Sequence, residues 1–319
     1  MSDARPFIIG DWGSSAMRLY LCRSTAVGPE ILETVSGPGI KFCADIEDAF
    51  FAAAQPWFDA HGPLPVTLGG MIGSPLGWRD CPYAACPTSV DSLQPLVTRF
   101  EARGVPITIA PGLRCTSVFG LPDVMRGEEM QIFGWLADAE VAADEARLLC
   151  LPGTHAKWAI TRGGGVESFF TSMQGEMFEV LVAHSLLGRA MELGPDRAAI
   201  TDRQEFVRGV TLMTEQPELA LEHAVFASRS RIVTGGLAPA SASSFLSGVL
   251  IGADVRDAIR AHANKGLLDK PVVLIGAERL CELYAQALAA LDVDSICVSA
   301  HDASIRGLSA LAEAVPADA

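Results

Sequence analysis

Short apolar runs alternate with glycine-rich turns in the first half of the chain, a pattern that is typical of strands joined by tight turns. Other segments space their apolar residues three or four positions apart, which predicts helices with one buried face. The predicted strands are residues 7–11, 17–22, 66–68 and 107–109, and the predicted helices are 47–57 and 128–139. The turn at 13–15 separates the first two strands, so the chain is expected to open with a strand–turn–strand unit.

A second strand–turn–strand unit begins near the middle of the chain. Its strands are predicted at 148–151 and 158–160, around a turn at 152–155. Helical spacing then dominates until strands return near the end. The remaining predicted helices are 176–187, 203–213, 219–228, 243–263, 278–291 and 303–315, and the remaining predicted strands are 272–275 and 295–298. The whole pattern is that of an α/β protein.

The length of 319 residues suggests two domains, since a domain typically has about 150 residues. The acidic stretch at 138–145 lacks an apolar stripe and lies between two similar hairpin openings, so it is the best candidate boundary. Half of the residues are apolar and 19% are charged, which is enough for a substantial buried core and excludes a disordered chain.

The formal charge of 24 − 38 = −14 argues against broad binding to nucleic acid or anionic lipid, because both carry negative charge. No apolar run approaches the roughly 20 residues that cross a bilayer, and no targeting segment is recognised, so a cytoplasmic location is expected. The eight cysteines are scattered and predicted to be reduced. The closest pair, Cys81 and Cys86, lacks the further ligands of a zinc site.

Several common catalytic motifs are absent. The chain has no P-loop motif, no G-x-G-x-x-G after the first strand, no G-x-S-x-G and no H-E-x-x-H. These absences make P-loop enzymes, nicotinamide-dependent dehydrogenases, α/β-hydrolases and zinc proteases poor candidates.

The two predicted hairpin turns carry groups that suit a phosphate chain. In the first, Asp11 ends a strand before Gly13, Ser14 and Ser15; a carboxylate there could hold hydrated Mg²⁺, while glycine and the hydroxyls face phosphate. The second, at 152–157, again offers hydroxyl and cationic donors. Each turn alone is more often an ordinary hairpin. One in each half suggests two lobes that grip one nucleotide.

A third segment places Asp123, Arg126, Glu128 and Glu129 at the start of a predicted helix. Acidic residues are common in a first helical turn because they interact favourably with the positive end of the helix dipole. The alternative interpretation is that one of these carboxylates is a general base that deprotonates a substrate hydroxyl. Phosphoryl transfer requires a carboxylate in that role.

The fourth segment, at 69–79, contains four glycines after a predicted strand, followed by Trp78 and Arg79. Such a backbone can wrap a small polar ligand, with Trp78 as a stacking wall and Arg79 as a fork for a carboxylate. A surface loop with Trp78 packed in the core explains the local sequence equally well.

These segments resemble the 2-dehydro-3-deoxygalactonokinase family. The similar motifs are D-W-G-S-S-x-x-R (11–18), G-M-I-G-S-x-x-G-W (70–78), D-V-M-R-G-E-E-M-Q (123–131), L-P-G-T-H-A-K-W (151–158), F-L-S-G-V-L-I-G-A-D (245–254) and V-L-I-G-A (273–277). They occur in the same order over essentially the whole chain. Gln174 departs from the pattern, which has threonine before Gly-Glu, and this puts a short hydroxyl contact there in doubt.

The resemblance implies an α/β chain with the two-lobed, actin-like (ribonuclease H-like) ATPase fold and a nucleotide cleft between the lobes. The lobes would be 1–143 and 144–319, with the terminal helix 303–315 crossing back to the N-terminal lobe. That helix and 128–139 would be the two connectors, and Gly307 would be tolerated if they cross closely.

The resemblance also implies residue roles. Asp11 would organise Mg²⁺, and Glu128 would be the general base, with Glu129 and Asp123 as reserves. The implied nucleotide and phosphate groups are Gly13, Ser14, Ser15, Gly153, Thr154, His155, Lys157, Gly276 and Ala277. The implied substrate-binding residues are Gly70, Met71, Ser74, Trp78, Arg79 and Arg126, and the cation for the substrate carboxylate is Arg79, Arg126 or Lys41.

The implied activity is an ATP- and Mg²⁺-dependent kinase that phosphorylates the C6 hydroxyl of 2-dehydro-3-deoxy-D-galactonate, in galactonate catabolism. The alternatives are a kinase of a related 2-keto-3-deoxy sugar acid, a phosphohydrolase in which the glutamate activates water, and a non-catalytic nucleotide-dependent regulator. The expected partners are a small sugar acid and ATP, without nucleic acid or membrane, and a homo-oligomer is left open.

Overall fold

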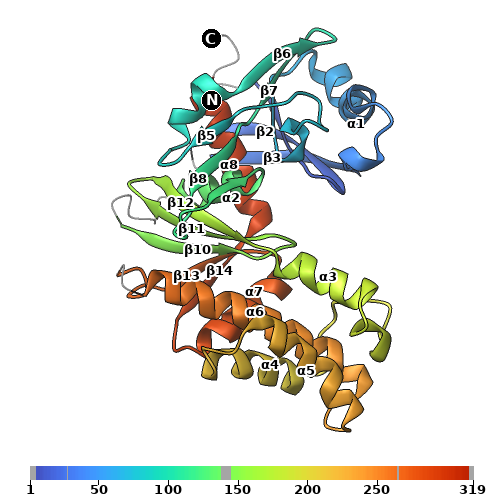
Figure 1. Ribbon diagram of the computed structural model, residues 1–319. Coiled ribbons are helices and arrows are strands. Elements are labelled where there is room, and N and C mark those ends of the chain that lie inside the picture. Colours follow the sequence, from blue (N-terminus) through green and yellow to red (C-terminus); the bar gives the residue numbers. More distant parts are fainter. Residues whose placement is uncertain (1–4, 27, 138–144, 264–265, 316–319) are drawn as a thin grey trace. The chain divides into compact units, whose positions relative to one another are not determined.

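The computed structural model describes residues 5–26, 28–137, 145–263 and 266–315. The chain forms two compact units (Figure 1). Unit 1 comprises Met1–Ala146, Ala159–Phe170 and Ser299–Ala319, and unit 2 comprises Arg147–Trp158 and Thr171–Val298. The sequence analysis expected the division between residues 143 and 144, three residues before the end of Met1–Ala146. It placed residues 159–170 in the second lobe, whereas they cluster with unit 1. Most of the expected acidic boundary, 138–144, falls outside the described residues.

Unit 1 is built on a six-stranded sheet of order β3-β2-β1-β4-β7-β6. Its strands are β1 (Phe7–Trp12), β2 (Ala16–Thr25), β3 (Gly28–Pro38), β4 (Val66–Gly69), β6 (Thr98–Ala102) and β7 (Val105–Ile109). The first three pair antiparallel, and β4 lies parallel to both β1 and β7. The carboxyl ends of β1 and β4 therefore share one edge, with Asp11 beside Gly69.

Helix α1 (Ile46–His61) packs on this sheet because its buried aromatic residues form one apolar cluster with side chains of the strands. Its first turn is capped by Asp45, whose carboxylate accepts the Asp48 N–H at 2.8 Å. A separate three-stranded sheet contains β5 (Tyr83–Ala85), β8 (Gly112–Thr116) and β9 (Pro122–Met125). Strand β9 leads directly into α2, so this small sheet fixes where that helix begins.

Helices α2 (Glu128–Leu136) and α8 (Ala300–Ala314) cross in unit 1 through two glycines. A Cβ on Gly134 would lie 1.7 Å from the Ala303 carbonyl oxygen, and one on Gly307 would lie 1.8 Å from that of Met130. The close crossing expected at Gly307 is confirmed, because the two backbones leave no room for a side chain.

The second sheet has the order β12-β11-β10-β13-β14. Its strands are β10 (Arg147–Leu151), β11 (Ala156–Arg162), β12 (Gly165–Ser172), β13 (Val272–Gly276) and β14 (Ser295–Ser299), with β10 parallel to β13. The order β3-β2-β1-β4-β7 of the first sheet is thus repeated. This repetition confirms the expected α/β class with two related cores, the arrangement of the actin-like ATPase fold.

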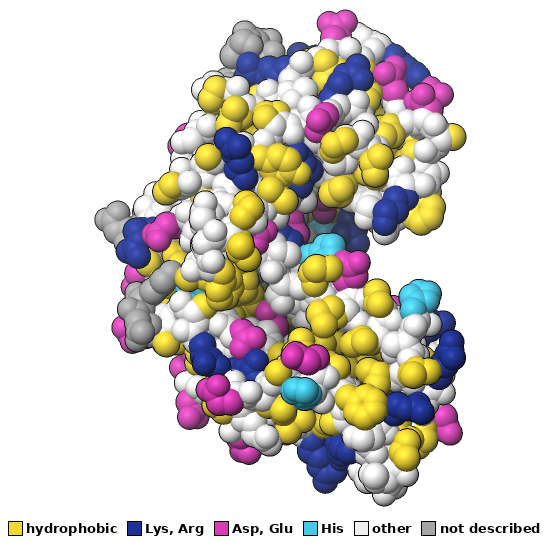
Figure 2. Space-filling model, in the orientation of Figure 1, with side chains coloured by type: hydrophobic (Ala, Val, Ile, Leu, Met, Phe, Trp, Pro, Cys, Tyr) yellow, Lys and Arg dark blue, Asp and Glu magenta, His cyan; other side chains and the backbone are white. Residues whose placement is uncertain are grey.

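The helices of unit 2 are α3 (Gln174–His184), α4 (Arg203–Glu215), α5 (Leu221–Val233), α6 (Ala242–His262) and α7 (Glu278–Ala289). Helix α6 is buried over most of its length and packs closely on α4 through Gly209 and Gly248. Among the described residues, no helix combines the length and apolar composition needed to cross a bilayer. On the face shown in Figure 2, lysine and arginine side chains are dispersed among acidic and apolar ones.

Candidate functional site

The first predicted turn follows β1 and is held by neighbouring backbone. The Gly13 N–H donates to the Ala16 carbonyl at 2.9 Å, which closes the hairpin. The Ile40 and Lys41 N–H groups donate to the carbonyls of Gly13 (3.1 Å) and Ser14 (3.2 Å). The turn is therefore fixed by hydrogen bonds, and its two serine side chains stay partly or fully exposed.

Asp11 lies against two glycine backbones. Gly70 has φ 93°, and a Cβ there would lie 2.9 Å from the Trp12 carbonyl oxygen and 3.1 Å from Asp11 Oδ1. Gly127 has φ 108°, and a Cβ there would lie 3.3 Å from the Gly70 Cα. Both positions favour glycine because of the positive φ and the close approach. The loop after β4 and the start of α2 thus meet beside Asp11.

The two adjacent glutamates of α2 have different environments. Glu128 is half-buried and Glu129 is fully buried. Glu128 Oε2 accepts the Arg126 N–H at 3.2 Å, and Glu129 Oε2 accepts the Gly127 N–H at 2.6 Å. Burial, reinforced by the charge of Glu128, raises the pKa of Glu129 to about 8. Glu129 is therefore a neutral acid at pH 7, whereas Glu128 reaches the surface.

Electrostatics also link Glu128 to Asp11. Burial is the main cause that raises the pKa of the Asp11 carboxyl, and the charge of Glu128 raises it further, while Arg18 and His301 lower it. Two carboxylates close enough to interact in this way attract a cation. The described residues contain no group of three or more His, Cys, Asp or Glu side chains suited to a metal. The Asp11 carboxylate fits Mg²⁺ nonetheless, because Mg²⁺ commonly binds one or two carboxylates and completes its shell with water and substrate phosphates.

Arg126 is buried next to this pair of acids. Its Nη2 donates to the Cys81 carbonyl at 2.7 Å, and the guanidinium lies 4.3 Å from the ring centroid of Tyr83. Its Nε and Nη1 are buried and have no hydrogen-bond partner among the described residues. A Cβ on Gly73 would lie 2.9 Å from Nη1, so the glycine loop after β4 forms one wall around this guanidinium. Ser74, the next residue, also has a buried hydroxyl without a partner among the described residues.

Trp78 and Arg79 lie elsewhere. The Trp78 indole is 8% exposed and packs against Phe50 and Phe100, with ring centroids 5.3 and 5.2 Å away. The stacking-wall interpretation is therefore replaced by its alternative, a core tryptophan. Arg79 is exposed; it donates to the Trp78 carbonyl at 3.0 Å and lies 4.7 Å above the Phe100 ring.

The remaining predicted residues of unit 1 surround the site less closely. Lys41 is exposed and follows Gly39 on the loop that supports the first turn. Met71 follows Gly70 and is half-buried against the core. Asp123 lies in β9, where its Oδ1 accepts the Val124 N–H at 2.7 Å.

The second predicted turn, in unit 2, is braced by the start of α3. A Cβ on Gly175 would lie 2.5 Å from the Gly153 carbonyl oxygen, and the Glu176 N–H donates to the Thr154 carbonyl at 3.0 Å. His155 pairs with the Glu176 carboxylate. Lys157 is buried, and its Nζ donates to the His155 carbonyl at 3.0 Å.

This turn forms one wall of a cavity of about 340 Å³ within unit 2. That volume is within the range of sites that hold small molecules. Three residues of the predicted nucleotide site, Gly153, Thr154 and Ala277, line it, and Gly276 directly precedes Ala277. The lining residues that sequence analysis missed are Phe178, Glu179, Ala198, Ser247, Leu250, Ile251, Arg279, Leu280, Leu283 and Tyr284. They come from helices α3, α6 and α7 and, in the case of Ala198, from the segment before α4, so no local pattern could have grouped them.

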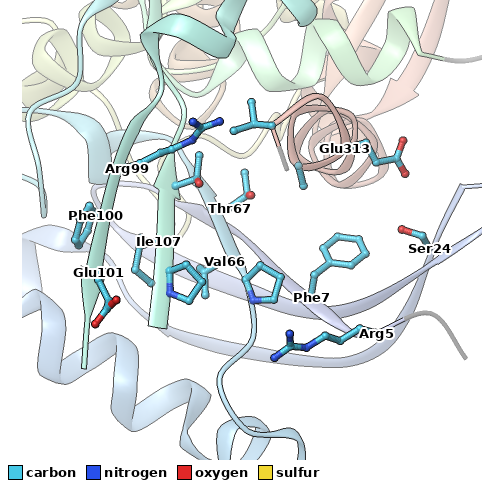
Figure 3. Close-up of a pocket in the computed structure, with 15 residues that line it drawn as sticks. Arg5, Phe7, Ser24, Val66, Thr67, Arg99, Phe100, Glu101, Ile107 and Glu313 are labelled. Carbon is cyan, nitrogen blue, oxygen red and sulfur yellow. The ribbon is translucent and has the colours of Figure 1, made fainter. Parts of the chain in front are cut away.

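Another cavity, of about 490 Å³, lies in unit 1 (Figure 3). Phe7, Val66 and Ile107 place it at the amino-terminal part of β1, β4 and β7. Ligands of open α/β sheets bind at the carboxyl ends of the strands, where Asp11 and Gly69 lie. This cavity is therefore distinct from the candidate site.

Three comparisons with known proteins agree. Residues 11–311 match the sequence model of a family described as 2-keto-3-deoxy-galactonokinase. A Rhizobium meliloti (strain 1021) protein named "Probable 2-dehydro-3-deoxygalactonokinase DgoK1" is 33% identical over 320 residues, which is 99% of each chain. The 2-dehydro-3-deoxygalactonokinase of Escherichia coli (strain K12) is 32% identical over 314 residues, 97% of this chain and 98% of its own. The crystal structure described as that of "a putative 2-dehydro-3-deoxygalactonokinase protein from Sinorhizobium meliloti" has a TM-score of 0.82 at 31% identity, and covers 97% of this chain and 98% of its own.

Proposed function

Because the chain belongs to the 2-keto-3-deoxy-galactonokinase family, we propose that it transfers the γ-phosphoryl group of ATP to the C6 hydroxyl of 2-dehydro-3-deoxy-D-galactonate. The products are ADP and 2-dehydro-3-deoxy-6-phosphogalactonate, and the step belongs to galactonate catabolism. The acceptor carries a carboxylate at one end and the reacting hydroxyl at the other. The enzyme therefore needs an anion site for the carboxylate and a base for the hydroxyl within one substrate-binding site.

The observation that carries this proposal is the buried guanidinium of Arg126, whose Nε and Nη1 have no partner among the described residues. An unpaired buried cation is costly, so an arrangement of this kind is explained by an anionic ligand. The carboxylate of a sugar acid matches the planar fork of arginine, whereas a neutral sugar does not. Tyr83 and the Cys81 carbonyl hold the guanidinium in place for it.

Glu128 acts as the general base in this proposal. It begins α2, it lies near Asp11, and the Arg126 N–H holds its Oε2 at 3.2 Å. Glu129 does not suit this role because its carboxyl group is buried and already protonated at neutral pH. Asp123 lies on β9 rather than on the helix. Glu128 would accept the proton of the C6 hydroxyl as the oxygen attacks the γ-phosphorus.

Asp11 would provide a carboxylate oxygen for Mg²⁺, which would neutralise the charge of the transferred phosphoryl group. The turn at 13–15 offers its serine hydroxyls and backbone to phosphate. In unit 2, the cavity beside Gly153 and Thr154 would receive the nucleoside, because its walls are largely apolar and Ala277 lines it. Lys157 supports the turn through the His155 carbonyl.

The test of this proposal is ADP release measured with a panel of acceptors. The panel contains 2-dehydro-3-deoxy-D-galactonate, its gluconate epimer, the corresponding neutral sugars and glycerol. Release should require a 2-keto-3-deoxy sugar acid and be fastest with the galactonate compound. ADP release without any acceptor would instead identify a phosphohydrolase, and equal rates with neutral sugars would overturn the role of the carboxylate.

Two arginine variants separate the competing anion sites. Arg126→Met should raise the KM for the sugar acid by about 10- to 100-fold with little change in the KM for ATP, since a charge-assisted contact is worth about 1.5–3 kcal/mol. Arg79→Met should leave the KM for the sugar acid close to that of the wild type, because Arg79 packs on Phe100 instead. The reverse result would move the carboxylate site to Arg79.

A further inference from the structure

Gln174 has an unsatisfied acceptor at the cavity of unit 2. It is the first residue of α3, it lines the cavity and it is 6% exposed. Its amide nitrogen donates to the Tyr284 hydroxyl. Its Oε1 is buried and has no hydrogen-bond partner among the described residues. A buried acceptor without a donor destabilises the protein unless something else supplies the donor.

A chain of hydrogen bonds determines which atom of the Gln174 amide has no hydrogen-bond partner. The Tyr284 hydroxyl donates to Asp254 Oδ2 at 2.7 Å, and Trp158 Nε1 donates to Oδ1 of the same carboxylate at 3.1 Å. An ionised carboxylate only accepts, so the tyrosine must use its one proton on Asp254. The hydroxyl can then only accept from Gln174. The amide nitrogen is thereby committed to Tyr284, and the oxygen remains as an acceptor.

Arg279 also lines the cavity, but its guanidinium already has hydrogen-bond partners. Arg279 donates to Asp196 Oδ2 at 2.7 Å and also to the Ala198 carbonyl, so its guanidinium is engaged. Much of the remaining wall is apolar, with Phe178, Ile251 and Leu280 among its members. In an apolar wall, one oriented acceptor discriminates between ligands, because a ligand that lacks the donor leaves the acceptor unpaired.

We propose that Gln174 is a specificity-determining residue for the nucleotide, and that its Oε1 accepts a hydrogen bond from a donor on the nucleoside. Three nucleoside groups supply such a donor, the 2′- and 3′-hydroxyls of the ribose and the exocyclic amine of adenine. Trp158, Asp254 and Tyr284 are positioning residues that orient the amide. This inference rests on the proposed function, which assigns the cavity of unit 2 to the nucleotide.

The experiment is calorimetric binding of ADP and three analogues to the full chain. In 2′-deoxy-ADP and 3′-deoxy-ADP one ribose hydroxyl is missing, and in inosine diphosphate a carbonyl replaces the amine. The wild type should bind one of the analogues about tenfold more weakly than ADP, and the analogue that loses affinity identifies the donor. Gln174→Met, which keeps the length of the side chain but removes the acceptor, should bind ADP and that analogue within about twofold.

Tyr284→Phe tests this chain of hydrogen bonds separately. Without the hydroxyl the amide of Gln174 can rotate, so the preference for ADP should fall although Gln174 is present. Gln204→Met, on the exposed surface of α4, is the matched control for the same change of side chain and should keep the wild-type preference. Tyr284→Phe also covers the case in which Gln174→Met does not fold.

Three results would overturn the inference. The first is a wild type that binds all three analogues as tightly as ADP. The second is a preference that persists unchanged in Gln174→Met, or in Tyr284→Phe where Gln174→Met does not fold. In both of these cases ADP still binds, and the proposed kinase function stands. The third is a wild type that does not bind ADP, which would overturn the nucleotide assignment together with the inference.

Discussion

Two neighbouring glutamates show how far the surroundings of a residue decide its chemistry. Glu128 and Glu129 are identical in type and adjacent in sequence, and successive residues of a helix point about 100° apart. One therefore faces Asp11 at the surface, while the other is enclosed by the protein. Burial keeps a proton on Glu129, whereas Glu128 is only half-buried.

The pair leads to a prediction about activity. Glu128→Gln should lower kcat by about 10²- to 10⁴-fold with small changes in KM, because the amide keeps the shape but cannot accept the proton. Glu129→Gln should reduce kcat far less, because an amide resembles the neutral acid and can still accept the Gly127 N–H. Steady-state kinetics of both variants check this expectation. A larger loss of kcat at Glu129 would exchange the two roles.

The raised pKa of Glu129 leads to a prediction of how the free energy of unfolding depends on pH. Its pKa rises from 4.5 to about 8 on folding, so between these values the native state holds a proton that the unfolded state has lost. The free energy of unfolding should therefore decrease as pH rises through this window, since stability falls wherever the native state binds more protons. Glu129→Gln should lack this contribution. Urea titrations of both proteins at several pH values measure it, and a difference that is constant with pH would contradict it.

At the scale of elements, glycine determines how α2 meets α8. The backbone of each helix contacts the other at Gly134 and Gly307. Helix α2 begins at Glu128, so the depth of this crossing sets the position of the proposed base.

Gly134→Ala should destabilise the protein by about 1–3 kcal/mol, because the added methyl group forces two backbones apart. The sign is informative, since alanine normally stabilises a helix by about 1 kcal/mol relative to glycine. Gly194→Ala is the control, because a Cβ there meets nothing within 4 Å. Calorimetric unfolding measures both variants. An unchanged or higher Tm for Gly134→Ala would show that the helices are farther apart.

For the whole molecule, the two units contain distinct ligand-binding features. The acids and Arg126 belong to unit 1, and the cavity beside Gly153 and Gln174 belongs to unit 2. The two larger sheets repeat one strand order, and a turn that contains glycine follows β1 in the first and β10 in the second.

Hydrogen exchange should resolve these two sites in one protein. ADP alone should slow amide exchange at the start of α3 and around residues 153–157, because those segments line or brace the cavity. The sugar acid alone should slow exchange around residues 70–74 and 126–130. Mass spectrometry of peptic fragments provides the measurement. Protection of 126–130 by ADP alone, without protection of unit 2, would contradict the assignment of the cavity.

The sequence by itself determined the elements and part of the site. Apolar spacing located most helices within a few residues, and the turns after β1 and β10 were evident from their glycines. Strand β3 was missed because most of its side chains are exposed, so no apolar run marks it. Strand β12 was missed as well. Asp11 and Glu128 were identified through motifs in which chemistry and local geometry coincide.

Only the tertiary structure showed that Glu129 is buried and Glu128 is not, and it alone separated Arg126 from Arg79 and a core tryptophan from a stacking wall. It also assembled the cavity of unit 2 and left the oxygen of Gln174 without a donor. The reason is physical: periodicity depends on residues a few positions apart, and it can therefore be recognised along the chain. Desolvation and hydrogen-bond partnership depend on groups that are distant in sequence, such as Gln174, Asp254 and Tyr284, and these meet only when the chain has folded.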